Sequence, residues 1–269
     1  MQPGREEKMD GTERYIYLCE DSIEGIFTAV YDAFAERHGH GRNHIKIASQ
    51  YYNQELLTTY ITVLTDYEKA VKVARTIQDK IGDDVYEFIQ KASVSADVEK
   101  ADAIYRVIIL ALKMGKKVLS YLTEPNVAFL MELERSTNNE IQKLLQFLRF
   151  EELKNGFLFA RINPKCAILP YLAEHFSDRF SGENWIIVDT VRGSMLIHEI
   201  DKGCSLMTTN DLDFDSFTPE YSENEELWRK LWKTFVDSIA IKERINPRLQ
   251  MQMLPLRFRK YMKEFHPDQ

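Results

Sequence analysis

Residues 147–162, FLRFEELKNGFLFARI, decide the fold because the apolar period of the chain changes within them. Before this stretch, apolar residues recur every three or four positions, which is typical of helices. Within it, two short apolar runs flank Lys154-Asn155-Gly156, and an Asn-Gly pair supplies the positive φ angles of a hairpin turn. We therefore predict paired strands at 147–153 and 157–162. The fold class predicted is α+β, with a helical and α/β part followed by an antiparallel sheet with flanking helices.

The residues that follow this hairpin predict more of the same sheet. Pro164 and Pro170 bracket the entry to a helix that ends near Phe180. Residues 185–189 and 194–200 are rich in β-branched and aromatic side chains, and Arg192-Gly193 lies in the turn between them. We predict a second antiparallel strand pair here.

The N-terminal side predicts an α/β and helical part at residues 13–135, after a flexible lead at 1–12. Asp21 with Glu24 resembles a capping box at the start of a helix, and Pro125 is placed to open a long one. We expect residues 136–269 to form the second part. Short strands are expected at 15–19, 44–48 and 60–64, and Asp66 is expected to cap the helix after them.

The last predicted helix begins with Ser222 and Glu225, which are spaced as a capping box. Pro247 disfavours helical angles at Asn246, so this helix is expected to end near Arg244. Its apolar stripe is expected to belong to the core and consists of Leu227, Leu231, Phe235 and Ile239.

Charge is distributed unevenly along the 269 residues, whose formal net charge is −7. Between Arg229 and Glu264 there are ten Lys or Arg against three acids, a local balance of +7, which leaves −14 for the remainder. A basic, aromatic-bearing end on an acidic chain predicts an anionic partner for that end.

Composition also indicates the cellular compartment of the protein. Cys19, Cys166 and Cys204 have no paired spacing of the kind that metal knuckles or disulfide frameworks show. Residues 1–12 lack the apolar core of a signal peptide, and no apolar run approaches the ~20 residues that span a bilayer. We predict a soluble, cytoplasmic protein without a membrane partner.

Two polar motifs carry weak signals. Residues 38–44 hold three histidines between glycines, a pattern that suits an exposed loop, a metal site or a phosphate cradle. Asp211, Asp213 and Asp215 resemble the opening of a calcium loop, but Ser216 and Ser222 stand where such loops need Gly and Glu. We predict a solvated loop there, and no metal or cofactor for the chain.

Two other groups of residues give stronger functional signals than these motifs. Asp189 lies near Arg149 or Arg192 in the predicted sheet, either as a buried ion pair or as part of an anion pocket at the strand ends. The second group lies between Ile241 and Glu264, where arginines alternate with rings after a helix-breaking Asn-Pro pair. Arginine forks clamp phosphates while aromatic faces accept bases, although a basic tail can also fold back onto an acidic body.

A family resemblance rests on these same blocks. It is carried by Trp228, Leu231-Trp232, Phe235, Ser238, Ile241, Arg244, Asn246-Pro247, Leu249-Gln250, Pro255, Arg257-Phe258 and Glu264-Phe265, together with residues 147–150, 175–180 and 185–192. From about Tyr15 to Phe265 the chain resembles a bacterial family of DNA-repair or DNA-metabolism proteins that contain a domain of unknown function. The family has an aromatic pair where this chain has Phe258-Arg259.

The resemblance implies DNA as a partner. Members of the family accompany a radical S-adenosylmethionine (radical SAM) protein that bears a DNA-binding element, and some are joined to a uracil-DNA glycosylase-type domain. The leading hypothesis is therefore a DNA-binding accessory protein in repair or base modification. The nucleic-acid contacts expected are Arg244, Asn246, Arg248, Arg257, Phe258, Arg259, Lys260, Tyr261 and Lys263.

Two alternatives stay open. In the first, the chain is an enzyme that acts on a nucleotide or damaged base, with Asp189, His175 and Arg192 as candidate catalytic residues. This hypothesis requires Asp189, His175 and Arg244 to converge on one pocket. In the second, the chain is a protein-interaction module, its acidic body docks a basic partner, and its tail belongs to its own core.

Overall fold

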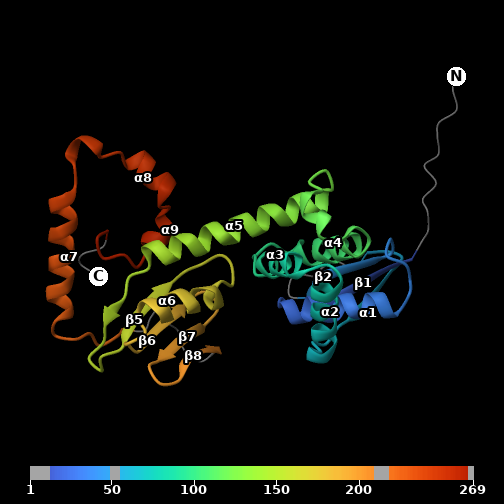
Figure 1. Ribbon diagram of the computed structural model, residues 1–269, viewed down its shortest axis with the longest axis horizontal. Helices are drawn as coiled ribbons and strands as arrows, with labels where there is room; N and C mark the ends of the chain where they lie inside the picture. The colour runs from blue at the N-terminus through green and yellow to red at the C-terminus, as the bar shows by residue number, and fades with distance from the viewer. Residues whose placement is uncertain (1–12, 49–54, 209–217, 266–269) are drawn as a thin grey trace. The chain divides into compact units, whose positions relative to one another are not determined.

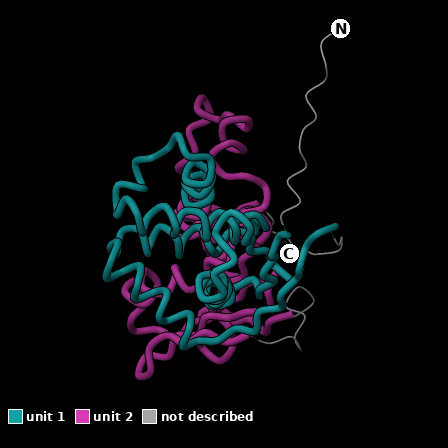
Figure 2. The backbone as a smooth tube through the Cα atoms, turned by 90° about the vertical axis from the view of Figure 1, so that its right-hand side faces the viewer, with its two compact units in different colours: residues 1–136 teal, residues 137–269 magenta. Residues whose placement is uncertain are grey.

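The computed structural model describes residues 13–48, 55–208 and 218–265. The chain divides into two compact units, residues 1–136 and 137–269, which Figure 2 draws in different colours. The division falls within the long helix α5 (Pro125–Phe147), which Pro125 opens as the sequence predicts.

Unit 1 is built on a parallel sheet of three strands in the order β2-β1-β3. Its strands are β1 (Arg14–Cys19), β2 (Asn43–Ile47) and β3 (Thr58–Thr62), close to the ranges predicted. Its helices are α1 (Ile23–Ala35), α2 (Tyr67–Lys80), α3 (Asp83–Ser93) and α4 (Lys100–Met114), followed by the 3₁₀ turn η2 (Gly115–Ser120). Their apolar stripes form one core with the sheet.

The helix starts in unit 1 follow local hydrogen-bond chemistry. Asp66 caps α2 as predicted, because its carboxylate accepts from the N–H groups of Glu68 and Lys69 at 2.9 and 3.2 Å. The predicted cap of α1 is one residue off. Ser22 accepts from Gly25 N–H at 3.0 Å, while Asp21 forms an ion pair with the buried Lys100 at 2.6 Å.

Unit 2 is built on a mixed sheet of five strands in sequence order (Figure 1). The strands are β4 (Glu151–Glu152), β5 (Leu158–Ile162), β6 (Trp185–Asp189), β7 (Ser194–Glu199) and β8 (Gly203–Thr208). The predicted pairs β4–β5 and β6–β7 are both antiparallel, and Gly156 has a φ of +82° in the first turn. The first strand is shorter than the predicted 147–153, because Phe147 still belongs to α5 and only Glu151–Glu152 form β4. The α+β prediction is confirmed. It omits β8, and it omits the parallel pairing of β5 with β6.

The parallel pairing follows from the helical crossover between β5 and β6. That crossover contains the 3₁₀ turn η3 (Leu169–Leu172) and the helix α6 (Ala173–Arg179), which ends beside Phe180 as predicted. Within this unit the buried residues include Phe176 and Trp185, so the crossover covers the sheet with its apolar side chains.

The C-terminal segment departs most from the prediction. It forms α7 (Glu225–Ile239), the 3₁₀ turn η4 (Lys242–Arg244), α8 (Pro247–Met253) and α9 (Leu256–Arg259). The Ser222 capping box does not form, because Asn224 occupies the cap position and the Ser222 hydroxyl donates to Glu152 Oε2 at 3.0 Å. In Figure 1, α7 runs beside the sheet, and α8 leads the chain back to α9 near the end of α5.

The apolar stripe of α7 was expected in the core, and this prediction is wrong. Its residues are 49–60% exposed: Leu227, Leu231, Phe235 and Ile239. No helix in the described ranges is long and apolar enough to cross a lipid bilayer.

Candidate functional site

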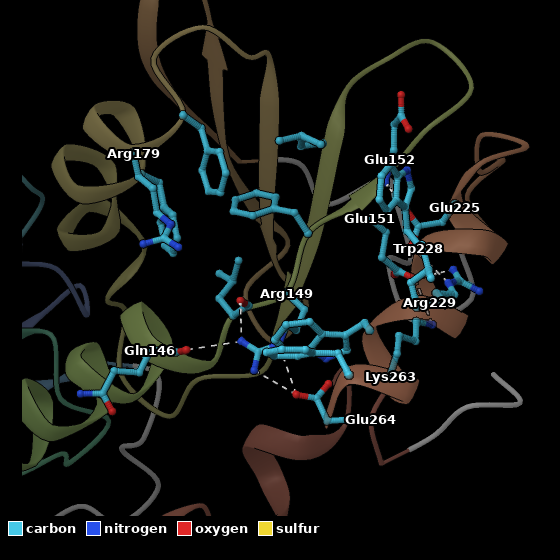
Figure 3. A pocket seen from close by; sticks show the side chains of 18 of the residues that line it. Gln146, Arg149, Glu151, Glu152, Arg179, Glu225, Trp228, Arg229, Lys263 and Glu264 are labelled. Carbon is cyan, nitrogen blue, oxygen red and sulfur yellow. Dashed lines mark hydrogen bonds and ion pairs between the residues drawn. The ribbon is translucent and has the colours of Figure 1, made fainter. Parts of the chain in front are cut away.

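Unit 2 contains a groove of about 1000 Å³ between α7 on one side and α6 with the start of the sheet on the other. Figure 3 shows Arg179 on the α6 side, Trp228 on the α7 side and Arg149 between them. Six aromatic side chains line the groove: Phe150, Phe176, Phe180, Trp228, Trp232 and Phe235. A concave surface this rich in rings is the first candidate for binding a ligand.

The α6 wall is a packed aromatic cluster. Phe150 lies edge-on to Phe176, Phe180 and Trp185, with ring centroids 5.4, 5.2 and 6.2 Å apart. Trp185 is fully buried and stacks on His198 at 5.1 Å. Edge-to-face packing fixes these rings, so this wall is a preformed surface.

The α7 wall presents its rings to solvent. Trp228, Trp232 and Phe235 are 57%, 40% and 53% exposed, although each lines the groove. The Arg149 guanidinium lies over the Trp232 ring at 5.3 Å and donates to Glu264 Oε1 at 2.9 Å. Arg149 therefore links α7 to Glu264, which follows α9, instead of pairing with Asp189.

A buried ionic network anchors the start of α7 to the sheet. Arg229 pairs with both Glu151 and Glu225, and Lys263 reaches Glu151 Oε1 at 3.2 Å. Tyr221 donates to the second oxygen of Glu151 at 3.0 Å, and the Arg229 guanidinium lies 4.4 Å over the Tyr221 ring. Glu225 in turn accepts from the backbone N–H of Glu152 at 2.9 Å.

Burial and charge shift the titration of this network. Burial raises the pKa of Glu225, and the charge of Glu151 adds to that rise. Burial also acts to lower the pKa of Arg229, but the charges of Glu151 and Glu225 outweigh it and raise the value. Burial and Glu151 together raise the pKa of Tyr221 to about 12.

The Tyr221 shift predicts an alkaline signature. Because its folded pKa lies above the ordinary value of 10.0, the stability that the neutral hydroxyl contributes is fully present below pH 10. It is lost as the pH rises toward about 12. The free energy of unfolding of Tyr221→Phe should therefore fall less steeply than that of the native chain above pH 10. Tyr121→Phe, whose ring is 43% exposed, is the control, and identical slopes for Tyr221→Phe and the native chain would contradict the prediction.

The groove is lined by equal numbers of positively and negatively charged residues. Four cations, Arg149, Arg179, Arg229 and Lys263, face four acids, Glu151, Glu152, Glu225 and Glu264. Three of the cations are in the ion pairs given above. Within the described residues, Arg179 forms no ion pair, and it stands on the groove rim beside the exposed His175. The cationic charge open to a ligand is therefore at the α6 rim.

The candidate catalytic residues fall in different places. His175 lines the groove, whereas Asp189 is fully buried and pairs with Arg192 at 3.1 Å. The Asp189 carboxylate also accepts from the Val191 N–H at 2.9 Å, and burial raises its pKa. Arg192 donates to the carbonyls of Pro164 and Lys165. The Asp189–Arg192 pair thus fastens a loop, and Arg244 lies outside this network on the exposed turn η4.

The predicted nucleic-acid residues after Pro255 pack against the body of unit 2. Arg257 pairs with the buried Glu140 at 3.0 Å, Lys263 pairs with Glu151, and Arg259 donates to the Leu254 carbonyl at 3.0 Å. Lys143 and Arg257 lie over the Phe258 ring, Arg161 and Lys260 lie over the Tyr261 ring, and Arg259 lies over Phe265. Arg257 and Lys263 therefore have their counter-ions inside the unit.

The predicted residues before Pro255 differ, because Arg244 and Arg248 are exposed. Asn246 is exposed too, but its side-chain oxygen caps α8 by accepting from the Leu249 N–H at 3.0 Å. Asn246 therefore has a structural role that the Asn-Pro pair already signals.

The histidine loop lies in unit 1, and its histidines do not converge. His38 stacks on Tyr15 at 3.8 Å, His40 bonds the Tyr105 hydroxyl at 2.8 Å, and His44 lies 3.6 Å from Asp102. The N–H groups of residues 42 and 43 donate to the Gly39 carbonyl, so they do not form a phosphate cradle. Across the described residues no group of three or more His, Cys, Asp or Glu could hold a metal ion. Asp211, Asp213 and Asp215 lie outside the described residues.

Glu140 and Glu151 are not singled out by the sequence analysis, and Arg179 enters it only within the block 175–180 that carries the family resemblance. Glu140 is 2% exposed on α5, and its carboxylate accepts from the N–H groups of Lys165 and Cys166 at 3.0 and 2.9 Å. A charged residue at an otherwise apolar helix position was the available signal for it. Glu151 and Arg179 look in sequence like ordinary surface charges.

Comparison with known proteins adds a family. No match is found among curated proteins. Residues 98–264 match the family described as a domain of unknown function, DUF4130. The match runs from just before α4 to the groove residue Glu264, and it is shorter than the resemblance that begins near Tyr15. Because it covers more than half of the 269 residues, the chain belongs to the DUF4130 family.

Proposed function

We propose that the groove of unit 2 binds single-stranded nucleic acid, and that the chain is a DNA-binding accessory in repair or base modification. The observation that carries this proposal is the presence of aromatic rings on both walls of one groove, exposed on α7 and half-buried or buried on the α6 side, with Arg179 at its rim. Every base has a π-face, and stacking on aromatic side chains contributes about 1–3 kcal/mol per base. Bases in a duplex have both faces covered, so unpaired bases fit these walls better.

Each wall has a separate role in this proposal. Trp228, Trp232 and Phe235 stack on bases from the α7 side, and Phe150 and Phe180 form the opposite surface. Arg179 and His175 contact the phosphates at the rim. The reaction itself belongs to a partner, and the family resemblance supports a radical SAM enzyme in that role.

Intrinsic fluorescence tests the proposal directly. The chain has three tryptophans, and two of them, Trp228 and Trp232, line the groove while Trp185 is buried. A short single-stranded oligonucleotide should quench the fluorescence of the native chain saturably. Trp228→Ala should weaken binding about tenfold, because one stacking contact is lost. Tyr67→Ala, 71% exposed in unit 1, is the matched control and should bind as the native chain does.

Salt dependence separates this site from a general basic surface. With balanced lining charges and one free rim cation, we expect a shallow slope of log affinity against log salt, about −0.7 to −1.4. Arg179→Glu should lower both the affinity and the slope. A flat salt response, or tight duplex binding that ignores Trp228→Ala, would contradict the proposal. The same titrations with and without the suspected radical enzyme test the partnership.

A further inference from the structure

A segment that leads away from the groove has a surface that the proposed function does not use. We define the arm as residues 233–253, which comprise the end of α7, η4 and α8. In the arm, only Val236 is partly covered, and all other residues are exposed. The chain on either side is fixed, by the Glu151 network before the arm and by the buried Leu254 after it.

The arm is apolar as well as exposed. Seven large apolar side chains are 48–66% exposed: Phe235, Ile239, Ile241, Ile245, Leu249, Met251 and Met253. Burial of apolar surface is the main driving force of folding and association. Because the apolar surface of the arm stays exposed, it contributes little to the stability of the isolated chain. Clusters of this kind on a soluble surface mark interaction sites.

The chemistry of the arm restricts its partner. Four cations, Lys233, Lys242, Arg244 and Arg248, stand among these side chains against two acids, Asp237 and Glu243. None of the four cations forms an ion pair with any residue that the structure describes. Apart from Phe235, which faces the groove, the apolar residues are aliphatic, so they offer no rings for bases to stack on.

We propose that the arm docks an acidic amphipathic helix of another protein. Leucine-type side chains on one face of such a helix cover the isoleucines and methionines of the arm, and its carboxylates pair with the unpaired cations. Methionine side chains adapt to the irregular surface of a partner helix. This inference goes beyond the proposed function and uses residues outside the groove lining, except for Phe235.

The test uses the full chain and a designed probe. The probe is a fluorescent helical peptide with leucine on one face and glutamate on the other. One control peptide has lysine in place of glutamate, and a second has the same composition in scrambled order. In fluorescence anisotropy, the acidic peptide should bind saturably and about tenfold more tightly than either control.

Variants assign the binding to the arm. Ile245→Ser and Arg244→Glu should each weaken the acidic peptide about tenfold. Leu122→Ser, whose parent side chain is 58% exposed in unit 1, is the matched control. Trp228→Ala should leave peptide binding unchanged, so failure at the groove and failure at the arm can be told apart.

Four outcomes would overturn the inference. They are absence of saturable binding by the acidic peptide, equal binding of the lysine peptide, arm-dependent binding to phosphatidylglycerol vesicles in preference to the peptide, and arm-dependent dimerisation in sedimentation equilibrium. The last two would assign the arm to a lipid surface or to a second copy of the chain.

Discussion

Glu140→Ala should lower the free energy of unfolding of unit 2 by about 3–5 kcal/mol. The substitution removes the partner of Arg257 and leaves the N–H groups of Lys165 and Cys166 without an acceptor. All three losses occur at a site where the carboxylate is 2% exposed, so water replaces the lost bonds poorly. The same residue joins α5, the loop after β5 and α9, so its loss should loosen the C-terminal segment as well.

Urea unfolding followed by tryptophan fluorescence measures this effect in the full chain. All three tryptophans lie in unit 2, so the signal reports that unit even if unit 1 unfolds separately. Gln142→Ala, an exposed position on α5 within unit 2, should change stability by about 0.5 kcal/mol or less. Glu140→Gln keeps one oxygen acceptor, so its free energy of unfolding should lie between those of the Glu140→Ala variant and the control variant. Equal midpoints for Glu140→Ala and Gln142→Ala would show that the buried network does not hold the C-terminal segment in place.

The features that the sequence predicts correctly are local. Asp66 caps α2, Pro125 opens α5, and Asn155-Gly156 forms a turn, because each signal acts within a few residues of itself. The predicted Asp189–Arg192 pair is also local, since its members are three positions apart. The β6–β7 register follows from two short apolar runs joined by a turn.

The features that it predicts poorly depend on distant contacts. Arg149 pairs with Glu264, 115 positions away. The residues around Arg149 do not indicate that Glu264 is its partner, and those around Glu264 do not indicate Arg149. An amphipathic stripe on α7 predicts a face that must be covered, but it does not predict whether the chain itself covers that face. The basic count near the C-terminus is correct, yet Arg229, Arg257 and Lys263 find their counter-ions on the same unit. A charge count therefore overstates the charge that a nucleic acid meets.

Glu151→Met should cost unit 2 about 3–4 kcal/mol and release α7 from the sheet. Glu151 is 8% exposed and holds Arg229, Lys263 and the Tyr221 hydroxyl together. Without it, Arg229 keeps only Glu225 of its two ion-pair partners, and Lys263 loses its ion pair with Glu151. Because α7 forms one wall of the groove, the same variant should also lose the fluorescence quenching by oligonucleotide.

A double-mutant cycle with Arg229→Met measures the coupling energy of the Glu151–Arg229 ion pair separately from the contacts that each side chain makes with other residues. If the cost of Glu151→Met arises from uncompensated charge, then removing Arg229 as well should recover part of it, and the double variant should be more stable than the summed single effects predict. The ion pair of Lys263 with Glu151 is lost in the double variant as well, so the recovery should be incomplete. Lys230→Met with Glu226→Met, an exposed pair on the same helix, is the matched cycle and should show little or no coupling, because water screens the two charges. Additive effects at Glu151 and Arg229 would mean that packing, and not this ion pair, attaches α7 to the sheet.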